Sequence, residues 1–149
     1  MAQTPPDGFV PVELGQGFSD LLGPLFERPT ELGPRYGFYV EEHHLNPALI
    51  CHGGMLLTVM DKAIGRSVLH AAPQILAAPT IQVSCDMVAP GMLGDWLETE
   101  TTHVHTTRNL GFASALLHGR GGIVVRATGI CKLKSTPFVP DAPLRRASD

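Results

Sequence analysis

The chain has 149 residues, of which 44% are hydrophobic and 17% are charged, and its formal net charge is −3. These values fit one folded domain with a single core and exclude a disordered chain. The mild acidity and the lack of a basic cluster argue against a nucleic-acid partner. No apolar run reaches the ~18 residues of a membrane span, and no signal peptide is recognisable. We therefore predict a soluble, cytoplasmic protein that binds neither nucleic acid nor a membrane.

The N-terminal part of the chain predicts little regular structure. Residues 1–17 are rich in proline and glycine and predict an N-terminal arm. A short helix is expected within residues 18–26, where Gly23 and Pro24 would end it. Alternation of aromatic and aliphatic residues with others predicts the first strand over residues 36–42.

One long helix is predicted over residues 53–70, with Pro47 before it and Pro73 just beyond its end. Its apolar residues fall on almost every side: Met55, Leu56, Leu57, Val59, Met60, Ala63, Ile64, Val68 and Leu69. This distribution predicts a helix enclosed by protein and not a surface helix with one apolar stripe.

Four strands are predicted after the helix, over residues 80–88, 95–107, 110–118 and 123–133. Short turns join antiparallel neighbours, so we predict an α+β fold in which a curved antiparallel sheet of about five to six strands wraps the helix. The chain would form a single domain over 1–149, with its core at about 36–134 and a loose C-terminal tail at 135–149. The edges of the sheet predict a homodimer, because a second copy could cover them.

Asp61 is the residue of the helix that most needs an explanation, because a carboxylate inside an apolar helix is costly unless it is used or paired. Gly54 lies seven residues earlier, about two turns, and therefore on the same face. Backbone N–H groups at a helix start are uncovered and positively polarised, so an anion or a polarised carbonyl could bind there. The alternative, of equal weight, is that Asp61 has a purely structural role and is paired with another residue of the protein.

A set of spaced residues supports a more specific interpretation: Asn46, His52-Gly53-Gly54, Asp61, Thr80 and the Pro90 and Gly94 pair. With the predicted element order, this set resembles the hotdog-fold acyl-CoA thioesterases, and most closely their PaaI-type branch, over residues 36–134. The resemblance implies hydrolysis of an aryl or medium-chain aliphatic acyl-CoA to the free acid and coenzyme A. It implies no metal and no cofactor, and an assembly of homodimers, with a dimer of dimers expected.

The resemblance also assigns roles to individual residues. The Gly53 backbone N–H would polarise the thioester carbonyl, and Asp61 would act as general base or as nucleophile. Thr80 would position the water or the carboxylate. The substrate would be held by Asn46, His52, Gly54 and Thr80. In such enzymes the acid of one subunit faces the glycine, histidine and asparagine of the other, so each site would need a dimer.

Some residues depart from the family pattern or cannot be assigned from it. Leu49 stands three positions before His52, where the family often has glycine. We assign no coenzyme A contacts, since Arg108, Arg120 and Arg126 fit solvated surface charges better than phosphate ligands.

For three further candidate sites, a structural role explains the residues better than a catalytic or metal-binding role does. Asp86, in the middle of a strand, could be a second acid but more readily faces solvent or pairs with a base. His103 and His105 share a strand face but lack a third metal ligand at suitable spacing. Cys51 and His52 are adjacent, so on an extended chain they point to opposite faces and do not form a catalytic pair.

Two other functions compete with hydrolysis. A non-catalytic acyl-CoA-binding or regulatory hotdog protein is the main alternative, although a pure binder has no need of Asp61 and Thr80. A hotdog dehydratase is the second, but the histidine motif usual in those enzymes is absent.

Overall fold

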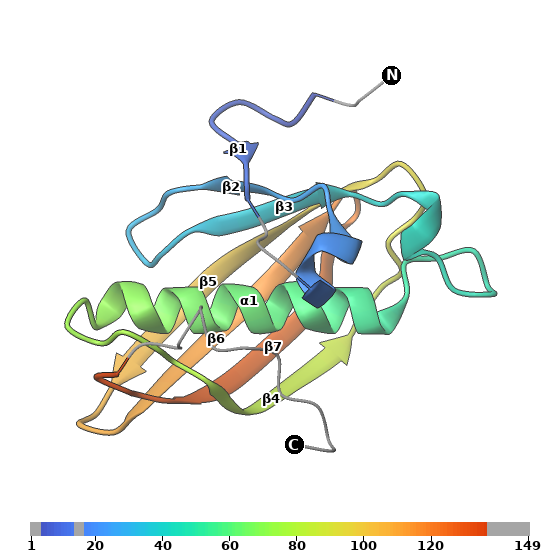
Figure 1. The fold of residues 1–149 in the computed structure, drawn as a ribbon. Helices are drawn as coiled ribbons and strands as arrows, with labels where there is room; N and C mark the ends of the chain where they lie inside the picture. The colour runs from blue at the N-terminus through green and yellow to red at the C-terminus, as the bar shows by residue number, and fades with distance from the viewer. Residues whose placement is uncertain (1–3, 14–16, 137–149) are drawn as a thin grey trace, which may run out of the picture.

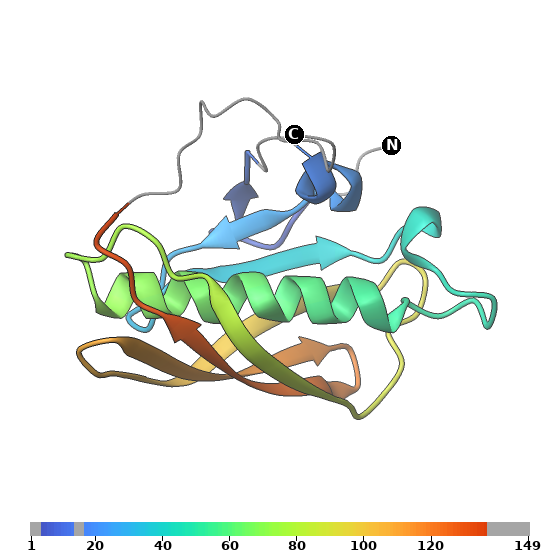
Figure 2. The ribbon, with the colours of Figure 1, turned by 60° about the horizontal axis from the view of Figure 1, so that its bottom comes forward.

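One long helix lies across the concave face of a curved, seven-stranded antiparallel sheet (Figures 1 and 2) in this computed structural model, which describes residues 4–13 and 17–136. The order of strands across the sheet is β1-β2-β3-β5-β6-β7-β4. The elements are β1 (Val10–Pro11), the 3₁₀ helix η1 (Gly17–Leu22), β2 (Phe26–Arg28), β3 (Arg35–Tyr39), the 3₁₀ helix η2 (Glu42–His44), α1 (Gly53–Ala71), β4 (Thr80–Met87), β5 (Trp96–Thr106), β6 (Leu110–Gly119) and β7 (Gly122–Lys132). The predicted hotdog arrangement is therefore confirmed.

The sheet has seven strands, where about five to six are predicted, and two of them, β1 and β2, lie in the N-terminal part where no strand is predicted. β1 and β2 fall in residues predicted as an arm and a short helix, and only η1 corresponds to that helix. Phe9 and Phe26 are buried against Trp96, with ring centroids 5.0 and 5.9 Å away. Strands of two and three residues are too short to show an alternating pattern, so these contacts distant in sequence determine where they form. The predicted tail lies mostly outside the described residues, from residue 137 on.

The core forms between one face of α1 and the inner face of the sheet. The helix buries Met55, Leu56, Val59, Met60, Ala63, Ile64, Ser67 and Val68. Glycines in the strands let the helix approach: a Cβ at Gly111 would overlap Val68, and one at Gly129 would come within 2.8 Å of Ile64. The polar Ser67 is satisfied by a hydrogen bond with the Thr101 hydroxyl at 2.7 Å. Close approach at two glycines therefore sets the distance between the helix and the sheet.

The opposite face of α1 is open, so the prediction of a fully enclosed helix is wrong for a single chain. Gly54 is exposed, Asp61 is partly exposed, and Leu57 keeps 38% of its surface. Next to this face, β4 forms an edge of the sheet and exposes Ile81 and Met87. Hydrophobic periodicity could not reveal this opening, because the apolar Leu57 lies on the exposed face. Within residues 4–13 and 17–136, no helix has the length and apolar character needed to cross a bilayer.

His44 connects the two 3₁₀ helices beside α1, and its burial makes folding sensitive to pH. Nδ1 accepts a hydrogen bond from the Glu41 N–H at 3.0 Å, so the neutral ring carries its proton on Nε2 and donates to the Leu22 carbonyl at 3.0 Å. Burial lowers the pKa of His44 below its ordinary 6.5. The unfolded chain therefore binds more protons, and the stability contributed by neutral His44 is lost as the pH falls below about 6.5.

We expect wild type to lose more unfolding free energy than His44→Gln between about pH 7.5 and about pH 5.5, since only wild type has this titrating group. Urea denaturation at both values measures the difference. Equal losses of unfolding free energy in the two proteins would contradict the role of His44 as the titrating group.

Candidate active site

The start of α1 presents one free backbone donor. His52 is the N-cap residue, and its Nδ1 accepts the Gly54 N–H at 2.8 Å. The Met55 and Leu56 N–H groups both donate to the His52 carbonyl, at 2.9 and 3.2 Å. The Gly53 N–H makes no hydrogen bond with any residue that the structure describes. It is therefore the first-turn donor available to a ligand, whereas the N–H of Gly54 is already engaged.

Asn46 shapes the loop that leads into this helix. Its Oδ1 accepts hydrogen bonds from the Ala48 and Ile50 N–H groups, at 2.9 and 3.3 Å. Its amide nitrogen makes no hydrogen bond with a described residue, so it can donate to a ligand. Leu49, at the position where the family often has glycine, has a φ of 61°, in the left-handed region that favours glycine. Leu49 therefore adopts a backbone conformation that favours glycine, at the cost of local strain.

Asn46 and Gly53 line the same hollow, which has a volume of about 420 Å³. The other lining residues are Ile50, Cys51, Leu56, Met87, Val88, Ala89 and Pro90. His52 is exposed beside Gly53, and its Nε2 is the donor of the neutral ring. Three of the predicted residues, Asn46, His52 and Gly53, therefore lie at one end of the helix.

Asp61 and Thr80 lie together farther along the helix. The Thr80 hydroxyl, at the start of β4, donates to Asp61 Oδ1 at 2.6 Å. Asp61 Oδ2 makes no hydrogen bond within the described part of the chain, and the Asp61 side chain lines a cavity. The carboxylate thus has the partner that a structural role would require, and it also has a free oxygen that could accept a proton or attack a carbonyl.

The two groups of residues share the exposed face of α1 but cannot act on one atom within a single chain. Gly53 and Asp61 are eight residues apart, which corresponds to about 12 Å along a helix axis. A thioester carbonyl is far shorter than this. Each chain therefore carries two separate groups of candidate residues. We name these half-sites after the roles that the resemblance predicts: the oxyanion half, with Asn46, His52 and Gly53, and the acid half, with Asp61 and Thr80.

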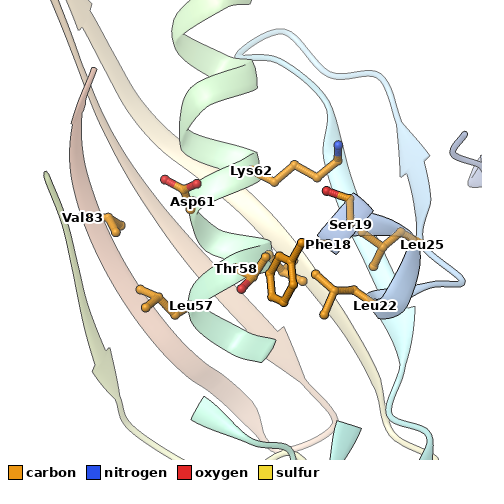
Figure 3. A pocket seen from close by; sticks show the side chains of 10 residues that line it. Phe18, Ser19, Leu22, Leu25, Leu57, Thr58, Asp61, Lys62 and Val83 are labelled. Carbon is orange, nitrogen blue, oxygen red and sulfur yellow. The ribbon is translucent and has the colours of Figure 1, made fainter. Parts of the chain in front are cut away.

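A cavity of about 590 Å³ opens beside the acid half, between α1, η1 and β4 (Figure 3). It is lined by Phe18, Ser19, Leu22, Leu25, Leu57, Thr58, Val59, Asp61, Lys62 and Val83. Most of these side chains are apolar. The sequence does not predict that η1 and Lys62 line this cavity. The contact between η1 and α1 joins distant segments of the chain, so no local sequence pattern indicates it.

The other residues that the sequence offers as candidates either pair with neighbouring charges away from both half-sites or cannot act as nucleophiles. Asp86 pairs with the Arg126 Nε at 2.7 Å in an exposed cross-strand contact, as its structural explanation predicts. Arg120 lies 3.3 Å from Asp95. Burial raises the pKa of Cys51 to about 12, so its thiol is not a nucleophile near neutral pH. Among the described residues, no cluster of three or more histidine, cysteine, aspartate or glutamate side chains could hold a metal.

Comparison with known structures defines the class first: this is a hotdog-fold protein. PaaI from Thermus thermophilus, as a single-residue variant, superposes with a TM-score of 0.68 at 22% identity, covering 77% of this chain and 96% of that one. AziG of S. sahachiroi gives 0.71 at 20% identity, covering 82% and 99%. A hypothetical thioesterase protein of Streptococcus pneumoniae TIGR4, crystallised with coenzyme A, gives 0.66 at 23% identity, covering 76% and 88%.

Sequence comparison then gives the family. Residues 50–125 match the thioesterase superfamily. The Pseudomonas aeruginosa protein named "Putative esterase PA0474" is 30% identical over 129 residues, which are 86% of this chain and 96% of that protein. The chain belongs to the thioesterase superfamily.

Proposed function

We propose that the protein is an acyl-CoA thioesterase that hydrolyses an acyl-CoA to the free acid and coenzyme A. The hydrogen-bonded pair of Asp61 and Thr80, open to a largely apolar cavity, is the observation that carries the proposal. Membership of the thioesterase superfamily supports the hydrolase class. The Streptococcus pneumoniae relative that was crystallised with coenzyme A supports coenzyme A as the carrier.

In the proposed reaction, the carbonyl oxygen of the thioester accepts a hydrogen bond from the Gly53 N–H, which stabilises the negative charge that develops there. Asp61 Oδ2 takes a proton from a water molecule as that water attacks the carbonyl carbon. The carbon–sulfur bond then breaks, and the thiolate of coenzyme A leaves and is protonated. Asp61 could instead attack the carbon itself, and water would then hydrolyse the resulting anhydride. Thr80 holds the carboxylate in orientation on either route.

A second copy of the chain would bring the two half-sites together. The distance along the helix between Gly53 and Asp61 requires the oxyanion half of one chain to meet the acid half of another. The open face of α1 and edge strand β4, which exposes Ile81 and Met87 and reaches from Asp61 to Gly53, offer the surface for such contact. We therefore propose a two-fold homodimer with two shared sites, and two such dimers as the expected assembly.

Thiol release from a panel of aromatic and aliphatic acyl-CoAs of several lengths tests the proposed activity. We expect turnover of at least one member, with free coenzyme A and free acid formed in equal amounts. Binding of acyl-CoA with no hydrolysis of any member would instead favour the acyl-CoA-binding function.

Mixing two inactive variants tests the shared site. Asp61→Asn damages the acid half and Gly53→Val obstructs the oxyanion half, so each homodimer should be inactive. Random reassembly should restore about a quarter of wild-type activity, because half of the dimers are mixed and one of their two sites is intact. Activity is measured after the variants are co-refolded. No recovery, with mixed dimers demonstrated by mass spectrometry, would show that both halves act within one chain.

We infer a cytoplasmic location from the cysteines. Cys51, Cys85 and Cys131 are all free, as expected in a reducing compartment.

A further inference from the structure

The cavity beside Asp61 contains a charged group that the proposed hydrolysis does not use, the ammonium of Lys62. This side chain is half-buried, and its Nζ lies 5.1 Å from the centroid of the Tyr36 ring. It makes no ion pair within 4.0 Å and no hydrogen bond with any described residue. Partial burial of a cation without an anionic partner has a desolvation cost, which an anionic ligand would offset.

The charges around Lys62 do not compensate it. Burial and the neighbouring Arg66 lower the pKa of Lys62, while Glu27 acts in the opposite direction without reaching ion-pair distance. Two cations therefore face one carboxylate on the Lys62 side, and the second carboxylate of the cavity, Asp61, lies toward β4. The ring of Tyr36 offers only a cation–π contact.

Lys62 and Asp61 occupy opposite sides of the cavity. Successive residues on a helix point about 100° apart, and Figure 3 shows Lys62 extending toward Ser19 of η1 while Asp61 lies toward Val83 of β4. The rest of the lining is mainly apolar and includes Leu22, Leu25, Leu57 and Val59. A molecule that reaches from Asp61 to the ammonium would therefore contact apolar side chains along the cavity wall.

We propose that Lys62 makes the enzyme selective for acyl groups that end in a carboxylate, an inference that rests on the proposed thioesterase function. The apolar lining would contact the methylene chain, and the terminal carboxylate would pair with the Lys62 ammonium. The Ser19 hydroxyl, which lines the same side, could add a second donor. A charge-assisted hydrogen bond in a partly dehydrated cavity is stronger than one between neutral groups. An acyl group with a methyl end would leave the ammonium without a partner.

Matched pairs of substrates test the selectivity. Butyryl-, hexanoyl- and octanoyl-CoA are compared with the carboxyl-terminated succinyl-, adipoyl- and suberoyl-CoA of equal chain length. At the chain length that spans the cavity, we expect wild type to favour the carboxylate by about tenfold in kcat/KM, mainly through KM. Omega-hydroxyhexanoyl-CoA ends in a neutral hydroxyl group. Its kcat/KM should exceed that of hexanoyl-CoA by much less than the kcat/KM of adipoyl-CoA does.

Variants of Lys62 separate its charge from a structural role. Lys62→Met should bring the ratio of kcat/KM between carboxyl-ended and methyl-ended chains to near one, whereas Lys62→Arg should retain the wild-type ratio. Lys134→Met is the matched control, because Lys134 is exposed near the end of β7 and lines neither half-site. It should keep the wild-type ratio.

The outcomes distinguish this inference from the proposed function. If methyl-ended chains are hydrolysed, but the ratio is near one in wild type or is unchanged in Lys62→Met, selectivity through Lys62 is refuted and the thioesterase stands. If no member of either series is hydrolysed, the proposed function fails and the selectivity fails with it.

Discussion

Replacement of Asp61 by asparagine should lower kcat by about 10²–10⁴-fold, the range that a general base commonly contributes. The expected loss comes from the charge and not from a change in shape. An asparagine Oδ1 can still accept the hydrogen bond that the Thr80 hydroxyl now donates at 2.6 Å, so the contact between α1 and β4 should persist. The substituted amide can neither take a proton from water nor attack a carbonyl. Steady-state thiol release and a denaturation curve for each protein provide the test.

Two companion variants make this result interpretable. Asp86→Asn is the control, since Asp86 is an exposed carboxylate on β4 that pairs with Arg126 on the neighbouring strand. It should retain full activity. Thr80→Val removes the donor to Asp61 while it keeps the branched shape, and it should reduce kcat less than Asp61→Asn does. Undiminished hydrolysis by a folded Asp61→Asn protein would exclude Asp61 both as base and as nucleophile.

The second large effect concerns folding. Gly111→Ala should lower the free energy of unfolding by about 1–3 kcal/mol, the usual cost of overpacking a core. The added Cβ would overlap Cγ1 of Val68, which is fully buried on α1. Valine is β-branched and cannot swing its methyl groups away within a helix, so the helix itself would have to move. Urea denaturation measures the change.

A glycine in the turn between β6 and β7 and a compensating mutation serve as controls for this prediction. Gly121→Ala should be nearly neutral, because a Cβ there would meet no heavy atom within 4 Å. Val68→Ala should destabilise the protein when made alone, because it leaves a cavity. Combined with Gly111→Ala, however, it should cost less than the sum of the two single changes, since it removes the overlapping methyl groups. Strict additivity would show that contact with Val68 is not the reason for the glycine.

The long elements were predictable because each has a strong local pattern. The predicted helix differs from α1 by one residue at its end, and the four predicted strands after it match β4, β5, β6 and β7 to within one residue at every boundary. β1 and β2 were not predictable, because two or three residues cannot show a period. Their position depends on Phe9 and Phe26 packing against Trp96 far along the chain.

The site was predictable as a set of residues but not as an arrangement in space. The spacing around His52 and the resemblance to a known family pointed to the six candidate residues, and in the structure the Thr80 hydroxyl donates a hydrogen bond to Asp61. Which residues lie at which half-site depends on the length of the helix between them. The cavity wall from η1 depends on contacts between distant segments, so residues such as Phe18 and Leu22 carry no recognisable signal in sequence.

The helical offset between Gly53 and Asp61 has a kinetic consequence. When neither half-site works alone, the rate per chain follows the fraction of chains that have a partner. Above the dissociation constant of the dimer, that rate is independent of protein concentration. Below that constant, the rate per chain falls in proportion to the protein concentration, so dilution alone would inactivate a chain whose residues are all intact. The total rate of hydrolysis in the cell would then depend on the protein's abundance in two ways: through the number of chains and through the fraction of chains that are paired.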